Sequence, residues 1–295
     1  SQYKNGKTPN PDILCNKEIK FDVFLNYAIN LKADYIATGH YCQKEYDGEN
    51  YKLLRGKDLH KDQSYFLCQV NQNQLKKILF PIGHLNKKEV REIAKKNNLI
   101  TAEKKDSQGL CFVGKIKLPI FLQQQIKKKK GDIIEVCQDS EIYLKEPLMG
   151  SEYLYQRNFG IKIGEHDGCH FYTIGQRKGL EIGGKKKPLF VLSTNVKENI
   201  IFVGMGKNHP GLFRNNLKIR RTEIHWLANK NKMRNNSKKK YLVRIRHRQE
   251  LQKAELFLQQ DYLYILFDKK QRGISKGQFA AWYHKNELIG SGPIC

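Results

Sequence analysis

The chain changes its secondary-structure pattern near residue 114, and this change limits the folds it can adopt. Before it, helical and strand segments alternate: residues 18–31 place apolar side chains on one helical face, and residues 33–38 form an apolar strand that stops at Gly39-His40. After it, short apolar segments separated by glycine turns follow one another without helices. The first pattern is typical of an α/β sheet with parallel strands, and the second of a small antiparallel barrel.

The expected elements can be placed more closely on both sides of this change. A second helix should begin at the cap Asn86, with Glu89 completing a capping box and Val90, Ile93 and Ala94 forming a buried stripe. The expected strands of the second half are 132–136, 190–194, 200–203, 241–248, 255–259, 262–267 and 278–283. Those from residue 188 onward are assigned to the barrel. Residues 229–240, rich in Asn and Lys, are expected to form a hairpin loop.

Charge indicates the kind of partner. Lys and Arg number 54 against 29 Asp and Glu, which gives a formal net charge of +25. This excess favours a polyanion, with nucleic acid first and an anionic membrane surface second. The sequence contains no run near the roughly 18 apolar residues that a membrane helix requires.

Seven cysteines are widely spaced, and their pattern predicts free thiols. They stand at positions 15, 42, 68, 111, 137, 169 and 295. Their odd number and the lack of a C-x-x-C pair argue against a secreted disulfide framework and a structural zinc site, so we expect no metal. With a polar start at Ser1-Gln2-Tyr3, the chain is expected to be cytoplasmic.

The segment "KTPNPDILCN", residues 7–16, places two prolines around Asp12 and a cysteine three residues later. One interpretation is a loop in which Asp12 caps a helix and Cys15 packs beneath it. The other is a stiff turn that presents a carboxylate and a thiol together, which requires a second reactive group elsewhere. Cys111 is a candidate, because it lies between Gly109 and Gly114 and follows two lysines, Lys104 and Lys105, that favour a thiolate. Taken alone, Cys111 is more often a buried structural thiol.

One strand is expected to contact a polyanion. In residues 241–249, "YLVRIRHRQ", period two places Arg244, Arg246 and Arg248 on one face. Such arginines repel one another unless phosphates or carboxylates lie opposite them. RNA phosphates are one possibility, and ion pairs with Glu250 or Glu255 are the other.

Several motifs together resemble those of the tRNA-specific 2-thiouridylases. The motifs, in order, are "TPNPDILCN", "IKF", "ADYIATGHY", "LLRG", "KDQSYFL", "LFPIG", "KKDSQGLCFVG", "TIGQRKGL" and "IGG". The resemblance extends from about Gly6 to Gly184 and continues more loosely through "RIRHRQ" and "KGQFAAWY". Long motifs in one order make it specific.

The resemblance implies a fold, an activity and partners. The fold would be a partial adenine-nucleotide α-hydrolase-like (PP-loop) parallel-sheet domain over residues 1–114, a small central domain over 115–187, and a C-terminal antiparallel β-barrel that binds tRNA over 188–295. The activity would be ATP-dependent 2-thiolation of the wobble uridine of tRNA anticodons. ATP, with Mg²⁺, would activate the uridine 2-carbonyl oxygen, and a cysteine desulfurase or sulfur-relay protein would supply persulfide sulfur.

The family's functional residues map onto this chain one by one. Cys111 would carry the persulfide, Cys15 would be the nucleophile that closes a transient Cys15–Cys111 disulfide, and Asp12 would be the acid–base or orienting group. The target base would contact Asn10, Pro11 and Asp12, and Gly39 would approach ATP. The expected tRNA contacts are His40, Lys61, Asp62, Gln63, Arg246, His247 and Gln278; for Asp62 the other interpretation is a helix cap.

Two departures from the family pattern modify these expectations. The family's Ser-Gly-Gly-Val-Asp-Ser-type pyrophosphate loop is not in this sequence, so we expect an N-terminally truncated copy or an internal start. A catalytically inactive tRNA-binding remnant is the alternative function, and a thiol-redox protein is a weaker one. Residues 138–161 are longer than the pattern requires, and the sequence assigns them no role.

Overall fold

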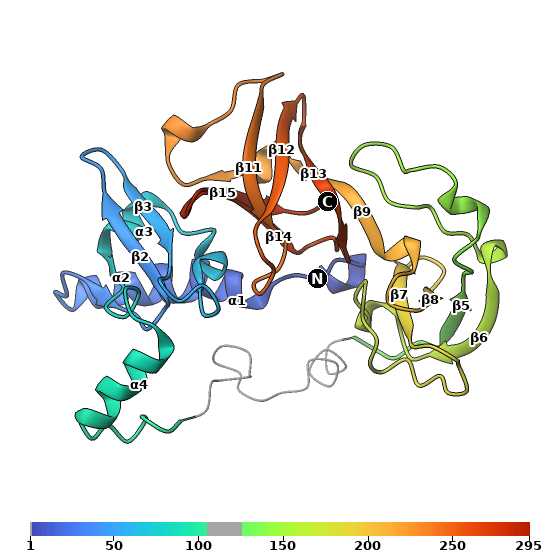
Figure 1. The fold of residues 1–295 in the computed structure, drawn as a ribbon, viewed down its shortest axis with the longest axis horizontal. Coiled ribbons are helices and arrows are strands. Elements are labelled where there is room, and N and C mark those ends of the chain that lie inside the picture. The colour runs from blue at the N-terminus through green and yellow to red at the C-terminus, as the bar shows by residue number, and fades with distance from the viewer. Residues whose placement is uncertain (1, 105–125) are drawn as a thin grey trace.

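The computed structural model describes residues 2–104 and 126–295, which form three parts arranged in a row (Figure 1). The C-terminal sheet lies between an N-terminal α/β part and a separate central sheet. This arrangement of a parallel pair followed by mainly antiparallel sheets confirms the predicted fold class. None of the helices in the described parts combines the length and apolar character that crossing a membrane requires.

The elements of each part are as follows. The N-terminal part contains α1 (Pro11–Leu14), a π-helical run (Cys15–Val23), α2 (Phe24–Asn30), β1 (Ile36–Ala37), β2 (Cys42–Tyr46), β3 (Tyr51–Arg55), a 3₁₀ turn (Ser64–Leu67), α3 (Gln72–Lys77), β4 (Ile78–Leu79) and α4 (Lys87–Lys96). The central part contains β5 (Gly131–Glu135), β6 (Ile161–His166), β7 (Leu189–Asn195) and β8 (Ile200–Met205). The C-terminal part contains β9 (Phe213–Arg220), β10 (His225–Trp226), β11 (Lys238–Arg244), β12 (Gln252–Gln259), β13 (Tyr262–Arg272), β14 (Phe279–His284) and β15 (Glu287–Pro293).

The first helix starts earlier than the apolar pattern indicated. The Asn10 side chain accepts the Ile13 N–H at 3.2 Å, and Pro11 occupies the first helical position, where its fixed φ suits a helix. Helical backbone then continues through the π-helical run to Asn30. The second proline of the opening motif therefore starts a helix, with Asp12 in its first turn.

The parallel sheet of the N-terminal part is small. The predicted strand 33–38 is reduced to β1, which pairs in parallel with β4 through Ile36–Ile78 and Ala37–Leu79. Gly39 lies two residues after the end of β1, so it lies near the carboxyl end of a parallel strand, as expected. Ligands in α/β sheets bind at this end of the strands.

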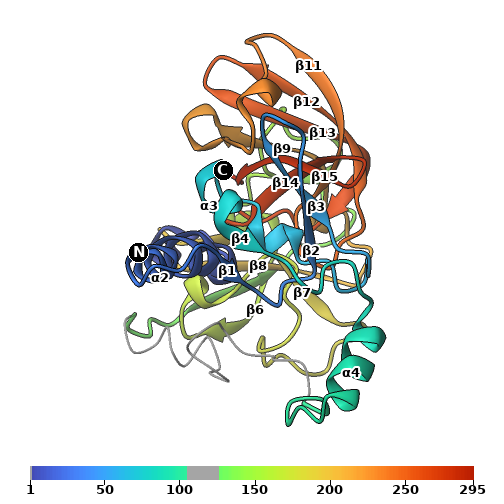
Figure 2. The same cartoon turned by 90° about the vertical axis from the view of Figure 1, so that its left-hand side faces the viewer.

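Helix α4 confirms its predicted capping box but not its predicted burial. Asn86 and Glu89 exchange the two capping hydrogen bonds. The stripe that we expected to be buried is not: no residue of α4 is buried, and Ile93 is 49% exposed. The reason is that α4 projects away from the other described elements in both views (Figures 1 and 2).

The central sheet has the strand order β6-β5-β8-β7, with β5 and β8 parallel and the other pairs antiparallel. The segments 190–194 and 200–203, which the sequence predicts to be part of the C-terminal barrel, belong to this central sheet instead. Both are strands, but they pair with each other and with β5. Their apolar residues, such as Val191 and Val203, are fully buried in the core of this sheet.

The C-terminal part is a long antiparallel sheet with the order β2-β3-β15-β14-β11-β12-β13-β9, and β10 pairs with β15. The hairpin β2–β3 of the N-terminal part extends this sheet where Leu54 pairs with Glu287. Beneath the sheet lies a core that includes Trp282, Val243, Leu256, Leu263 and Ile265, all fully buried. A second core contains residues of both the first and the third part, such as Tyr65 and Tyr283. Shared strands and this shared core, rather than a linker, therefore join the two parts.

Residues 138–161, which the sequence left without a role, connect the central and C-terminal sheets. The Gly150 N–H donates to Asn216 Oδ1 on β9 at 2.6 Å. Glu152 pairs with the buried Arg214 of β9 at 3.1 Å, and Glu146 pairs with Lys270 of β13. Because Arg214 is only 8% exposed, this connection is a built part of the fold.

Candidate active site

Asp12 and Cys15 lie one turn apart at the start of the first helix. Positions three apart on a helix lie on the same face, so the carboxylate and the thiol are neighbours on one surface. Cys15 is 8% exposed, and Asp12 is partly buried. Both interpretations of the opening motif therefore hold in part: Asn10, not Asp12, caps the helix, and the helix presents Asp12 and Cys15 together.

The segment before this helix is fixed to the C-terminal sheet. Asn10 Nδ2 donates to Gln278 Oε1 at 3.3 Å, and Gln278 Nε2 donates to the Thr8 carbonyl at 2.9 Å. The Thr8 N–H in turn donates to the Lys276 carbonyl at 2.8 Å. Gly277 has φ +86°, and a Cβ there would lie 3.0 Å from Thr8 backbone atoms, so glycine permits the close approach. Two residues predicted separately as contacts, Asn10 and Gln278, thus touch each other.

Phe66 connects this helix to His247. Asn16 Nδ2, next to Cys15, donates to the Phe66 carbonyl at 3.3 Å, and the Phe66 and His247 rings lie 4.2 Å apart. His247 Nε2 bonds to the Asp62 carbonyl at 2.9 Å. Because a carbonyl only accepts, Nε2 must carry the hydrogen and Nδ1 is left as an acceptor. Burial lowers the pKa of His247, which favours this neutral form.

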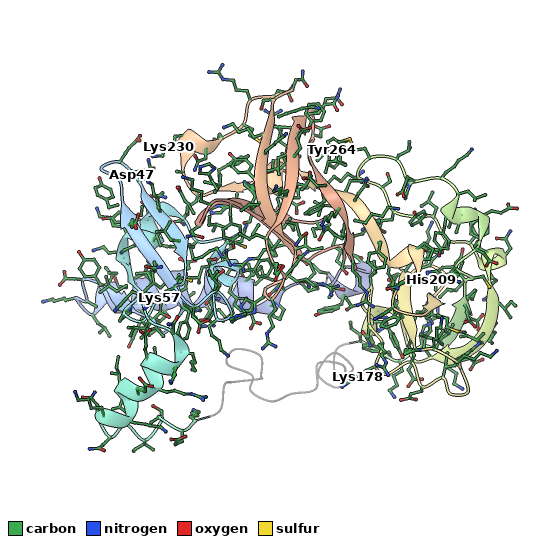
Figure 3. All side chains as sticks on the ribbon, in the orientation of Figure 1. Asp47, Lys57, Lys178, His209, Lys230 and Tyr264 are labelled. Atoms are coloured by element: carbon green, nitrogen blue, oxygen red, sulfur yellow. The ribbon has the colours of Figure 1, made fainter. Side chains whose placement is uncertain are left out.

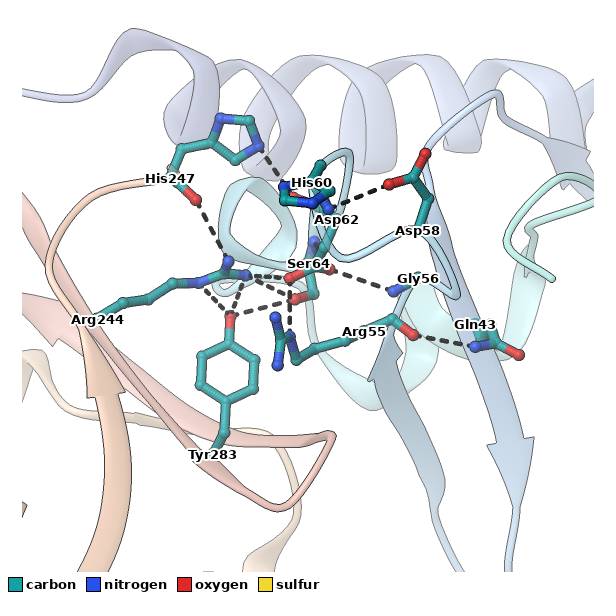
Figure 4. Close-up of polar contacts among 10 residues, drawn as sticks. All are labelled: Gln43, Arg55, Gly56, Asp58, His60, Asp62, Ser64, Arg244, His247 and Tyr283. Atoms are coloured by element: carbon teal, nitrogen blue, oxygen red, sulfur yellow. Dashed lines mark hydrogen bonds and ion pairs between the residues drawn. The ribbon is translucent and has the colours of Figure 1, made fainter. Parts of the chain in front are cut away.

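The Asp62 carboxylate is buried at the junction of the N-terminal and C-terminal parts (Figure 4). Its Oδ2 lies 2.8 Å from Arg244 Nη2 and 3.2 Å from Arg55 Nε. Its Oδ1 accepts the N–H groups of Gly56 at 3.2 Å and Ser64 at 3.1 Å. All these partners are protein groups, so this carboxylate positions the 61–64 loop, and the carbonyl of Asp62 positions His247.

Arg244 completes this buried cluster, and its position corrects the expected arginine face. The guanidinium donates to Tyr283 Oη at 2.7 Å and to Ser64 Oγ at 2.8 Å, and Arg244 is 2% exposed. The predicted strand to residue 248 ends at Arg244, and the chain then turns. Arg244 therefore meets neither phosphate nor the two glutamates considered, whereas Arg246 and Arg248 remain exposed.

The 61–64 loop also contacts the end of β1. Gln63 Oε1 accepts the Tyr41 N–H at 3.0 Å, and the Gln63 N–H donates to the Tyr41 carbonyl at 3.1 Å. His40 precedes Tyr41, so Lys61, Gln63 and His40, predicted as contacts of one partner, lie on neighbouring segments. At Gly39 a Cβ would meet no atom within 4 Å, so the space beside it is open to a ligand.

Arg246 joins this surface to the central part. Its Nη2 donates to the Gly273 carbonyl at 2.8 Å and to the Ile174 carbonyl at 3.4 Å. Gly273 has φ +67°, and a Cβ there would lie 2.6 Å from the same nitrogen. The guanidinium is held by carbonyls and makes no described ion pair, so its charge stays available on an exposed residue.

Three family models match the chain. They are described as a tRNA methyl transferase HUP domain (residues 1–115), a tRNA methyl transferase PRC-barrel domain (150–205) and an aminomethyltransferase beta-barrel domain (216–294). A protein named tRNA-specific 2-thiouridylase MnmA from Christiangramia forsetii is 51% identical over 309 residues, covering 100% of this chain and 78% of that protein. The proteins of the same name from Flavobacterium johnsoniae (50% identical over 309 residues; 100% and 78%) and Karelsulcia muelleri (51% over 299 residues; 99% and 78%) match similarly. This chain belongs to the tRNA-specific 2-thiouridylase family.

The thiols can now be compared with the roles that the 2-thiouridylase family implies. Cys111 lies outside the described residues, so its distance from Cys15 stays a prediction. Burial raises the pKa of Cys68 to about 12 and that of Cys169 to about 11, and it also raises the pKa of Cys42. Such thiols hold their protons at neutral pH and are poor nucleophiles. Cys137 is exposed, and Cys295 is partly exposed.

Sequence reasoning missed the residues that hold the site together. Phe66 and Tyr283 were not among the expected site residues, Arg244 was expected to face a polyanion or a glutamate, and Asp62 was expected to face tRNA or to cap a helix. The available signal was the apolar run after Asp62, which contains the buried Tyr65 and Leu67 and indicates that this loop turns inward.

We expect His40 to make stability depend on pH. Burial, followed by the charge of Lys20, lowers the pKa of His40 to about 4, from an ordinary value near 6.5. The unfolded state then binds a proton that the folded state does not, so stability should rise with pH from about 4 to about 6.5. The contribution is on the order of 3 kcal/mol. His40→Asn should flatten the pH dependence of urea unfolding over this range.

The control for this prediction is His60→Asn, because the side chain of His60 is exposed whereas that of His40 is buried. Two other histidines, His166 and His209, are also buried, so the comparison is between the pH slopes of variant and parent rather than between total stabilities. Parallel curves for His40→Asn and the parent protein would show that His40 is not the titrating group.

Proposed function

We propose that this chain carries out the family reaction, the ATP-dependent 2-thiolation of the wobble uridine of tRNA through a cysteine persulfide. The relatives with this name match the whole chain at about half identity. The observation that supports the proposal most is the junction of the Asp12–Cys15 helix with Gln278 and, through Phe66, with His247. It gathers in one place residues that were expected to contact tRNA and lie far apart in the sequence.

The residues present fit a nucleotide next to Gly39. This glycine follows a parallel strand, lies next to open space, and belongs to the part that matches a HUP domain. ATP supplies activation of the uridine 2-carbonyl oxygen, which makes that oxygen a leaving group. Mg²⁺ would accompany the triphosphate. Gly39 would border the nucleotide, and neutral His40 would face the tRNA beside it.

The chain's own residues then perform the sulfur transfer. The terminal sulfur of a Cys111 persulfide, loaded by a sulfur-donor protein, forms a bond to uridine C2 as the activated oxygen leaves. The Cys15 thiolate attacks the Cys111 sulfur, the S–S bond breaks, and its electron pair stays on the sulfur bound to C2. The base gains its thiocarbonyl, and a Cys15–Cys111 disulfide remains, which an external dithiol reduces.

Asp12 and the segment around it hold the target base. The carboxylate lies one helical turn from the attacking thiol, which suits a group that accepts a proton from Cys15 or orients the uridine. Asn10 and Pro11 fix the backbone that approaches the base. An anticodon loop leaves its bases largely unpaired, so little energy is spent in extruding the uridine.

The experiment is a thiolation assay on the complete gene product. The protein is incubated with unmodified tRNA, ATP, magnesium and a cysteine desulfurase with cysteine, and nucleosides from digested tRNA are analysed by mass spectrometry. We expect 2-thiouridine to appear only when ATP is present. Tight tRNA binding without any 2-thiouridine would instead support the tRNA-binding remnant.

A further inference from the structure

A turn of the central part lies directly against the proposed base-binding segment. Thr173 Oγ1 lies 3.4 Å from Thr8 Oγ1, and the Ile174 carbonyl accepts from Arg246. The turn continues through Arg177 and Lys178, whose side chains are exposed. Neither the opening motif nor the expected tRNA contacts include this turn, and nothing in the reaction above uses it.

Internal hydrogen bonds fix the shape of this turn. Gln176 Oε1 accepts the Thr173 N–H at 3.1 Å, and its Nε2 donates to the Lys178 carbonyl at 2.9 Å. Tyr172 Oη donates to the Gly179 carbonyl at 2.9 Å. Backbone bonds between the turn and Val191 attach it to β7. Arg177 and Lys178 therefore project from a rigid base.

Most acidic residues near this turn, with Glu181 as the exception, are already paired with other cations. Four carboxylates of the central sheet each meet a lysine or arginine: Asp132 with Arg157 and Lys162, Glu135 with Lys185, Glu165 with Lys162 and Lys130, and Asp167 with Lys128. Within residues 2–104 and 126–295, no carboxylate pairs with Arg177, Lys178, Lys186 or Lys187, all of which are exposed. These four residues form what we name the central basic surface.

The shape of this surface suits an extended anion. Arg177, Lys186 and Lys187 line an open concavity of about 580 Å³, which one carboxylate, Glu181, also borders. Lys178 lies at the edge of the central part in the side-chain view (Figure 3). Cations that remain unpaired around a concave surface attract a phosphate backbone. The turn that carries Arg177 also carries Thr173, which contacts Thr8 of the proposed base-binding segment.

We propose that the central basic surface binds phosphates of the anticodon stem of the tRNA substrate. This inference rests on the proposed function, since it extends that substrate from the base to the stem. Contacts of this kind orient the tRNA without reading its sequence, so they should contribute to affinity for all tRNAs alike. The central part then has a role in holding the stem while the other two parts hold the loop.

The test compares the salt dependence of tRNA binding in two double variants, Arg177→Ala/Lys178→Ala and Lys186→Ala/Lys187→Ala. Each lost phosphate contact should reduce the log–log salt slope by roughly one unit, so each double variant should lose about two. Binding is measured by fluorescence anisotropy with unmodified tRNA and with an isolated anticodon stem-loop. The same loss is expected with both RNAs.

The matched control is Lys239→Ala/Lys240→Ala, which removes the same charge from exposed residues at the far end of β11 from Arg244. Slopes that change no more in the central variants than in this control would overturn the proposal. So would normal tRNA slopes combined with lost sulfur delivery, because the surface would then serve the sulfur donor. A parent protein that neither binds nor thiolates tRNA would refute the proposed function itself.

Discussion

Asp62→Ala is expected to lower the free energy of unfolding by about 3–5 kcal/mol, because it leaves buried charge without a counter-ion. The guanidinium of Arg244, 2% exposed, would lose its 2.8 Å partner, and that of Arg55 would lose its partner at 3.2 Å. The N–H groups of Gly56 and Ser64 would also lose their acceptor. Urea unfolding followed by tryptophan fluorescence measures the effect, since Trp282 lies in the neighbouring core.

The control for this substitution is Asp34→Ala, which removes an exposed carboxylate from the same part of the chain and should change stability by no more than about 0.5 kcal/mol. A second variant, Asp62→Ala/Arg244→Met, removes both buried charges of the shortest pair. If burial of an unpaired charge is the cause, the double variant should recover part of the loss. A loss below about 1 kcal/mol for Asp62→Ala would contradict the central role of this carboxylate.

A different substitution at this position, Asp62→Asn, separates a positioning role from direct contact with tRNA. Through its carbonyl and its loop, Asp62 sets the positions of His247 and Gln63. Asp62→Asn keeps the shape of the side chain and removes its charge, so the folded fraction should keep the parent's salt slope for tRNA if the carboxylate only positions its loop. An increased slope on removing this negative charge would show that the carboxylate faces phosphate.

Local signals in the sequence predicted those parts of the structure that depend on neighbouring residues. The capping box of Asn86 and Glu89 and the apolar runs of the strands need only a few adjacent positions, and the structure contains them. One of the two interpretations of the opening motif places the helix cap at Asp12, whereas the structure places it two positions earlier, at Asn10. Helix and strand types follow from such signals because backbone preferences and capping act over three or four residues.

Contacts between distant segments were the part that sequence patterns could not supply. The alternation of side chains along a strand correctly places Arg244 and Val243 on opposite faces of the sheet, but it does not say which residues cover each face. The covering group is the 61–64 loop, whose Ser64 lies 180 positions from Arg244. The same limit explains why β7 and β8 were expected in the wrong sheet. Their apolar residues would fit any sheet, and only the parallel pairing of β8 with β5 shows that they belong to the central one.

Cys15→Ser and Cys111→Ser are each expected to abolish 2-thiouridine formation, the largest functional effect that our proposal predicts. A serine hydroxyl has almost the same shape as a thiol, but it neither carries a persulfide nor attacks a disulfide sulfur at neutral pH. Because Cys15 lies on a helix whose start is fixed by Asn10 and Gln278, tRNA affinity should change little. Nucleoside mass spectrometry and anisotropy measure the two quantities on the same samples.

Cys137→Ser is the matched control, because this thiol is exposed and belongs to neither the helix nor the Cys111 segment. It should retain parent activity, which excludes a general effect of removing any accessible thiol. Trapping provides the positive result: the parent protein, quenched with a thiol-alkylating reagent after one turnover without reductant, should contain a peptide pair joined through Cys15 and Cys111, which requires Cα atoms within about 7 Å. Full activity of Cys15→Ser would remove Cys15 from the mechanism, and the burial of this side chain would then be its only role. Loss of activity in both serine variants, with tRNA affinity intact and the disulfide recovered only from the parent, would assign both thiols to the transfer step.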